Sequence, residues 1–176
     1  MIKILENAIM KKSILIIGTI FLSTITFAQQ RLKPIYDENI NPLEQIDVAV
    51  NKAKAENKFV ICQVGGNWCP WCLRFADFVT NDSIISNIID DSFVYIHVNY
   101  YPSRSNTAEL KDRDKALLDR LSHPERFGFP VLVVLNEEGK VIHIQDSGYL
   151  EEDKSYNHEK TLRFFNNWTP GAVNNH

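Results

Sequence analysis

The residues of this chain best suited to do chemistry are two cysteines separated by two residues, in the run Trp68-Cys69-Pro70-Trp71-Cys72. A β-type run that ends in Gly65-Gly66-Asn67 comes just before them, and Pro70 suits the first turn of a helix. The sequence therefore predicts Cys69 at a helix N-terminus. There the unpaired backbone N–H groups and the helix dipole favour a thiolate.

This position predicts different roles for the two cysteines. Cysteines at the start of a helix in such motifs have pKa values of roughly 3.5–7.5, instead of about 8.5 for a free thiol. We expect Cys69 to be the nucleophile that forms a mixed disulfide, and Cys72, one turn inside the helix, to be the resolving residue that attacks it. This chemistry needs no metal or organic cofactor, and we expect none.

Zinc binding and a purely structural disulfide are the alternatives for the pair. A structural zinc site needs four ligands, but the third cysteine, Cys62, lies in a predicted strand, and none of the five histidines is near the pair in sequence. A structural disulfide that closes so short a loop gains little in the chain-entropy account. Cys62 has the apolar neighbours Val60, Ile61 and Val64, which favour a buried core residue over a third redox cysteine.

Helix and strand patterns alternate around the motif. Strands are predicted at residues 59–64, 93–98, 131–135 and 141–145, with a hairpin turn at 136–140. Helices are predicted at 42–57 after the cap Asn41, at 70–79, and at 84–89 after Asn81-Asp82-Ser83. A fourth helix is predicted at 106–121, where Asn106 and Glu109 form a capping box. A polar loop is predicted at 146–157, followed by a last helix around Leu162, Phe165 and Trp168. This order predicts an α/β domain whose central mixed sheet has helices on both faces and ends in a hairpin and a helix.

The composition and the first residues limit the classes of protein to which the chain can belong. The 176 residues suit one domain, and a net charge of −3 gives no reason to expect a nucleic-acid binder. Residues 1–28 resemble a signal peptide, with Lys11 and Lys12 before an apolar run at 14–27 and with Thr26 and Ala28 before the expected cleavage site. The run is short for a membrane span, which needs about 20 apolar residues. An uncleaved anchor is the alternative.

We therefore expect residues 29–176 to form one domain that is secreted across the inner membrane, into a bacterial periplasm. We expect it to be a monomer that has no membrane attachment after signal cleavage.

Around the two cysteines and the segment before Val131, the sequence resembles the thioredoxin-like superfamily. It is similar in particular to exported single domains and to the C-terminal domain of the transmembrane disulfide reductase DsbD. The resemblance spans roughly Leu43 to Trp168. It includes the Trp-Cys-x-x-Cys motif after a strand and a turn, and the run Phe127-Gly128-Phe129-Pro130-Val131, which is similar to the cis-proline segment of the family.

The resemblance implies a thioredoxin fold and thiol–disulfide exchange with protein thiols or disulfides, after which an unidentified redox partner recharges the pair. It also implies a cis peptide between Phe129 and Pro130 beside Cys69, with the backbone there aligning the partner chain as an added strand. The expected substrate-binding residues are Trp68, Pro70, Trp71, Phe129 and Pro130. A binding module of the cell envelope that has the same fold but no catalysis is the alternative function.

Two residue choices depart from the family pattern. Family members often carry a buried Asp or Glu six residues before the first cysteine, where this chain has Gln63, which cannot titrate. Resolution by Cys72 is therefore expected to be slow near neutral pH and faster as Cys72 ionises. The Pro-Trp dipeptide between the cysteines differs from the Gly-Pro of thioredoxin, so the resemblance does not transfer a redox potential.

Overall fold

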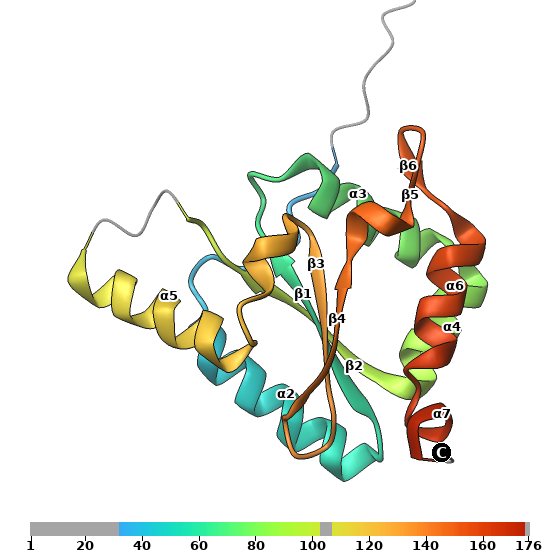
Figure 1. The fold of residues 1–176 in the computed structure, drawn as a ribbon, viewed down its shortest axis with the longest axis horizontal. Helices are drawn as coiled ribbons and strands as arrows, with labels where there is room; N and C mark the ends of the chain where they lie inside the picture. The colour runs from blue at the N-terminus through green and yellow to red at the C-terminus, as the bar shows by residue number, and fades with distance from the viewer. Residues whose placement is uncertain (1–31, 103–106, 175–176) are drawn as a thin grey trace, which may run out of the picture. The chain divides into compact units, whose positions relative to one another are not determined.

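The computed structural model describes residues 32–102 and 107–174, which are built around a four-stranded sheet with the order β2-β1-β3-β4 (Figure 1). The predicted signal peptide and the predicted cap Asn106 lie outside the described residues. Strand β1 (Phe59–Gly65) pairs in parallel with β2 (Phe93–Asn99) and antiparallel with β3 (Val131–Leu135). Strand β4 (Val141–Asp146) pairs antiparallel with β3. The mixed sheet and the hairpin predicted from the sequence are confirmed.

Helices cover both faces of this sheet, as predicted. On one face lie α2 (Pro42–Glu56) and α5 (Ala108–Arg120); on the other lie α3 (Pro70–Asn81), α4 (Ser83–Ser92) and α6 (His158–Asn167) (Figure 1). Alternation along β1 sends Cys62 and Val64 into the core against α2 and α5, and Ile61 into the core on the other face. Because β1 is buried along its whole length, the residue that follows it is held firmly in place.

Side-chain caps fix where the helices begin. Asn41 Oδ1 accepts the backbone N–H of Leu43 at 3.0 Å, and Asp82 Oδ1 accepts those of Ile84 and Ile85 at 3.0 and 3.1 Å. Both caps were predicted from the sequence. Asp82 also lies 2.6 Å from Nδ1 of His158, so the same carboxylate joins the start of α4 to the start of α6.

Two expectations need correction. The cap of α5 among the described residues is Thr107, whose hydroxyl accepts the N–H of Leu110 at 3.2 Å, so the helix begins later than the predicted capping box. Residues 146–157 are not an unstructured loop, since they form the 3-10 turn η2 (Ser147–Leu150) and the ribbon of β5 (Glu151–Glu152) and β6 (Ser155–Tyr156). Tyr156 is buried in the aromatic core and anchors this otherwise polar segment.

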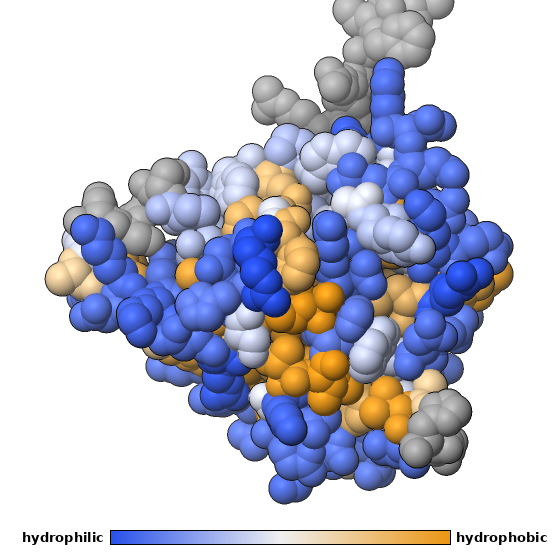
Figure 2. All heavy atoms as spheres, in the orientation of Figure 1, coloured by the Kyte–Doolittle hydropathy of each residue, from blue (hydrophilic) through white to orange (hydrophobic). Residues whose placement is uncertain are grey.

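Two short elements complete the fold. A 3-10 turn, η1 (Pro124–Phe127), precedes the segment that enters β3, and a short helix, α7 (Pro170–Asn174), follows α6. Strand β4 lies at one edge of the sheet and is half-buried throughout. Figure 2 accordingly shows hydrophobic residues gathered over the β3–β4 hairpin and bordered by hydrophilic ones. In the described ranges, no helix has both the length and the apolar character of a membrane span.

The double role of Asp82 leads to a stability prediction. Replacing Asp82 by Ala removes the acceptor of two backbone N–H groups, and we expect it to lower the free energy of unfolding by about 1 kcal/mol. Urea denaturation at neutral pH measures this loss. Asp82→Asn keeps a capping oxygen, so it is expected to cost less; an equal cost in both variants would show that charge matters more than the cap.

The same residue predicts a pH dependence. The backbone N–H of Ile85, and then His158, hold the pKa of Asp82 below its ordinary value. The stabilisation is therefore present above the pKa of the unfolded chain and is lost as pH falls through the lower pKa of the folded protein. The difference between wild type and Asp82→Ala is expected to shrink in acid.

Candidate active site

The two cysteines meet at the beginning of α3, as the sequence predicts. Cys69 has an extended backbone and is the N-cap of the helix, with Pro70 next to it in the first turn. The backbone N–H of Cys72 donates to Sγ of Cys69 at 3.1 Å, and the two sulfurs form a disulfide. A sulfur that already accepts a helical N–H is placed to hold negative charge after reduction.

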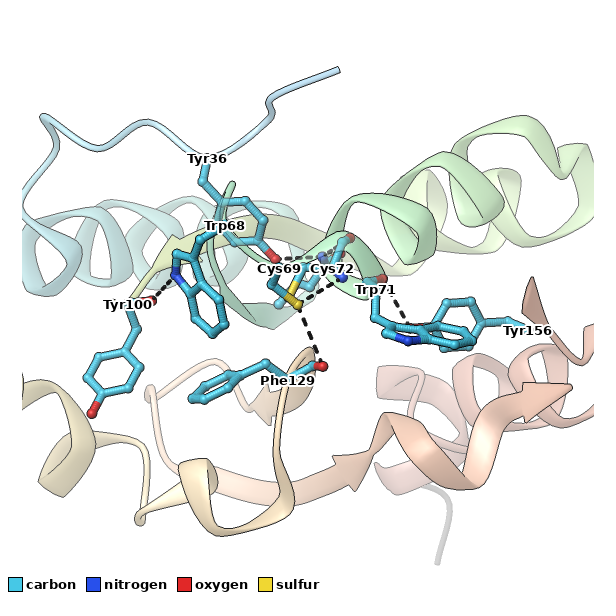
Figure 3. The surroundings of a disulfide bond; sticks show 9 residues. Tyr36, Trp68, Cys69, Trp71, Cys72, Tyr100, Phe129 and Tyr156 are labelled. Atoms are coloured by element: carbon cyan, nitrogen blue, oxygen red, sulfur yellow. Dashed lines mark hydrogen bonds between the residues drawn. A yellow bond between two sulfur atoms is a disulfide. The ribbon is translucent and has the colours of Figure 1, made fainter. Parts of the chain in front are cut away.

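The two cysteine residues differ in their access to solvent. The exposed fraction is 5% for Cys69 and 0% for Cys72. On its outer side, Sγ of Cys69 lies 3.7 Å from the carbonyl oxygen of Phe129 (Figure 3). The peptide bond between Phe129 and Pro130 is cis, which confirms the expectation from the family resemblance. Phe129 is half-buried and Pro130 is buried, so the side chain of Pro130 lies beneath the surface that Phe129 helps to form.

On one side of the disulfide lies Trp68, which packs against other aromatic side chains. Its indole N–H donates to the carbonyl of Tyr100 at 3.0 Å, and its ring packs edge-on against Phe129 and Tyr101, each at 5.5 Å between centroids. Trp68 is 37% exposed, so its ring and that of Phe129 form a partly open apolar wall next to Cys69 (Figure 3).

Trp71 lies on the other side of the disulfide. Its ring packs edge-on against Tyr156 at 5.6 Å, its carbonyl accepts the Tyr156 hydroxyl at 3.1 Å, and the guanidinium of Arg74 lies 4.5 Å above it. Trp71 is half-buried while Pro70, between the cysteines, is exposed. The five expected substrate-binding residues thus all lie around the disulfide, with Pro130 buried beneath the surface.

A residue that the sequence did not single out, Tyr36, lies beside the pair. It belongs to the strap, which we define as residues 32–41, and it is buried in one cluster with Cys69 and Cys72 (Figure 3). Asn67 fastens the strap, because its Oδ1 accepts the N–H groups of Ile35 and Tyr36 at 3.0 and 3.1 Å and its Nδ2 donates to the Tyr36 carbonyl at 2.8 Å. Asn67 directly precedes Trp68, so the strap is tied to the motif itself.

Gln63 is fully buried and joins three elements around Cys72. Its Nε2 donates to the hydroxyl of Tyr36 at 2.6 Å and to the carbonyl of Cys72 at 2.8 Å, and its Oε1 accepts the hydroxyl of Tyr95 at 2.7 Å. Burial raises the pKa of both tyrosines above the ordinary value of 10.0, so both stay protonated at neutral pH. The position therefore carries hydrogen bonds without any charge.

Cys62 is separate from this site. It is fully buried on the opposite face of β1, in the cluster under α2 and α5, and burial raises the pKa of its thiol to about 12. It is a free thiol. The prediction of a buried core residue is confirmed.

Comparison with known proteins identifies similar folds. The thioredoxin-like domain family matches residues 46–162, and no curated protein matches the chain. A disulphide isomerase from Xylella fastidiosa Temecula1 is similar at 24% identity, with a TM-score of 0.62 over 77% of this chain and 96% of that chain. The C-terminal domain of Neisseria meningitidis DsbD in the reduced form matches at 20% identity and a TM-score of 0.43, over 70% of this chain and 94% of its own.

The close approach of β1 to the disulfide gives a prediction. A Cβ added at Gly65 would overlap Sγ of Cys72 and lie 3.0 Å from the Tyr36 hydroxyl oxygen. Gly65→Ala is therefore expected to lower the free energy of unfolding by roughly 1–3 kcal/mol, as measured by urea denaturation of the oxidised protein.

The matched control is Gly171→Ala in α7, where an added Cβ meets no heavy atom within 4 Å. We expect no loss of stability there. If Gly65→Ala were as stable as Gly171→Ala, the packing of Cys72 against β1 would be looser than described.

Proposed function

Because the chain belongs to the thioredoxin-like domain family, we propose that it is a thiol–disulfide oxidoreductase that exchanges disulfides with exported proteins through Cys69 and Cys72. The observation that carries this proposal is the double position of Cys69. Its sulfur caps α3, and Cys69 is the more exposed residue of the two. The N–H of Cys72, together with the helix dipole, stabilises negative charge on Cys69 after reduction.

The exchange proceeds in two displacements. The Cys69 thiolate attacks one sulfur of a partner disulfide, so a new bond joins Cys69 to the partner and the other partner sulfur leaves as a thiolate. Cys72, as a thiolate, then attacks Sγ of Cys69 and releases the second partner sulfur. The partner ends with two thiols and the pair ends as the disulfide; the same steps in reverse oxidise a partner.

Docking of the partner chain uses the surface around Cys69. We assign Trp68 and Phe129 to the apolar wall on one side, and Pro70 and Trp71 to the other side, as substrate-binding residues. The backbone of Phe129 can pair with an extended partner segment as an added strand. Pro130 is buried and contributes by holding Phe129 in this position, 3.7 Å from the reacting sulfur.

Trapping of partners tests the proposal against a binding module without catalysis. In Cys72→Ser the mixed disulfide at Cys69 still forms, but a serine hydroxyl cannot displace it, so partner adducts are expected to accumulate. The variants are expressed in the native compartment, quenched with acid, and compared on non-reducing and reducing gels.

Two control variants define the roles. Cys69→Ser is expected to trap far less because Cys72 is fully buried, and Cys62→Ser combined with Cys72→Ser is expected to trap normally. If Cys72→Ser gave no more reduction-sensitive adducts than Cys69→Ser, Cys69 would not be the nucleophile and the binding module would be the better interpretation.

Export is the part of the proposal that rests on residues 1–28. We propose that they direct the protein across the inner membrane into a bacterial periplasm and are then removed. N-terminal sequencing of the protein from its native compartment is expected to begin at or near Gln29. A mature protein that begins at Met1 or Met10 would contradict the periplasmic assignment.

A further inference from the structure

The hydroxyl group of Tyr36 and the sulfur of the resolving cysteine both lie next to the backbone of Gly65. A Cβ on Gly65 would have Sγ of Cys72 and Oη of Tyr36 as its two nearest atoms, so these two atoms flank the same point. Figure 3 shows the Tyr36 ring directed from the strap toward the disulfide, and Tyr36, Cys69 and Cys72 form one buried cluster. A phenol thus occupies the inner side of the pair, which the partner cannot reach.

The hydrogen bonds of Gln63 determine whether the Tyr36 hydroxyl donates or accepts in its contact with Gln63. The carbonyl of Cys72 can only accept, so the amide end of Gln63 that faces it must be the NH₂ group. The same NH₂ group donates to Tyr36, whose oxygen is therefore the acceptor in that contact. A phenol also has one hydrogen to donate. In the described part of the chain, this hydrogen has no nitrogen or oxygen acceptor.

We propose that Tyr36 donates this hydrogen to the Cys72 thiolate during resolution and so stabilises, by a hydrogen bond, an anion for which Gln63 supplies no titrating neighbour. The inference rests on the proposed function. The Cys72 thiol gives its proton to water, and the thiolate, held by Tyr36, attacks Sγ of Cys69. The bond between Cys69 and the partner breaks, and the partner leaves as a thiolate. Tyr36 keeps its own proton throughout.

This role predicts a particular pH dependence of resolution. A hydrogen bond to the charged form lowers the pKa of Cys72, which increases the fraction of thiolate near neutral pH. A thiolate of lower pKa is also a weaker nucleophile, with a Brønsted slope of about 0.4–0.5. Removing the hydroxyl therefore has opposite effects below and above the pKa of Cys72, and the two rate profiles should cross.

The rate profile reports on Cys72 only if the neighbouring titratable groups keep the same protonation state over the pH range of the measurement. The titratable and charged groups on the elements that pack around Cys72 are Tyr36 and Glu38 from the strap, Tyr95 and His97 from β2, Tyr156 from β6, and Cys69 and Arg74 at the start of α3, with Cys62 on the far face of β1. Burial raises the pKa of all three tyrosines, puts that of Cys62 at about 12, and lowers that of His97 to about 4. These five groups keep one protonation state between pH 6 and roughly 9.5. Cys69 is blocked in the mixed disulfide.

The experiment measures resolution in the full-length reduced protein with glutathione disulfide as the partner. Samples are quenched in acid at successive times, and mass spectrometry separates the glutathionylated form from the internal disulfide. For Tyr36→Phe we expect the midpoint of the rate profile to rise by about one pH unit. Resolution should then be about threefold slower near pH 7, and the two rate profiles should cross on the alkaline side of the wild-type midpoint.

Tyr95→Phe is the matched control. It removes the hydroxyl at the other end of Gln63 and leaves Tyr36 in place, so its midpoint is expected to equal that of wild type. If Tyr95→Phe shifts the midpoint as much as Tyr36→Phe, the Gln63 network causes the effect and the proposal is wrong. A uniform slowing of Tyr36→Phe at every pH would be a packing defect and would also overturn it.

A second variant covers the case in which Tyr36→Phe is too unstable to purify. Asn67→Ala removes the three hydrogen bonds that hold the backbone of Ile35 and Tyr36. It should raise the midpoint in the same direction, and an unshifted midpoint would then reject the role of Tyr36. Failure of the proposed function is a different result, because wild type itself would then form no internal disulfide from the glutathionylated protein.

Discussion

The first turn of α3 has to fit between the end of β1 and the cis-proline segment, and this confinement determines the chemistry of the site. On the inner side the backbone of Gly65 leaves room for the sulfur of Cys72 and for nothing larger. On the outer side the Phe129 carbonyl approaches the sulfur of Cys69. In this arrangement the sulfur of Cys69 caps the helix, while Cys72 is fully buried. Two chemically identical side chains thereby have different surroundings.

Two uncharged amides extend this arrangement to distant parts of the chain. Gln63 joins β1 to the carbonyl of Cys72, to the strap and to β2, and Asn67 joins the motif to the strap. An amide can donate and accept at once without a change of charge. The interior beside the disulfide is therefore polar, and these two side chains add no charge to it.

The parts of this site that are local in sequence could be predicted, and those that depend on tertiary contacts could not. Pro70 after a Gly-rich turn places Cys69 at a helix start without knowledge of the rest of the fold. The cis bond before Pro130 followed from the family resemblance and not from the residues alone. Tyr36 was missed because the strap has no helical or strand period, and because it lies outside the matched family region of 46–162.

The ribbon at 151–156 was missed for a related reason. Its residues are almost all polar, and polar composition predicts a loop. The single side chain that fixes it, Tyr156, packs against Phe75 and Trp71, which lie far away in sequence. Turn Asn136–Lys140, in contrast, was predictable because Asn136 accepts the N–H groups of Glu138 and Lys140 within the turn itself.

The position of Cys62 on the opposite side of the sheet affects which disulfide forms when the chain folds. An unfolded chain with three thiols can close any of three disulfides, of which only one is useful. Once β1 is in place, the sheet stands between Cys62 and the other two sulfurs, so the fold and not the intrinsic reactivity of the thiols selects the pair. A thiol enclosed in the central strand reacts with an alkylating reagent only when that core opens. The chain therefore contains its own reporter of global opening, which is independent of the state of the redox pair.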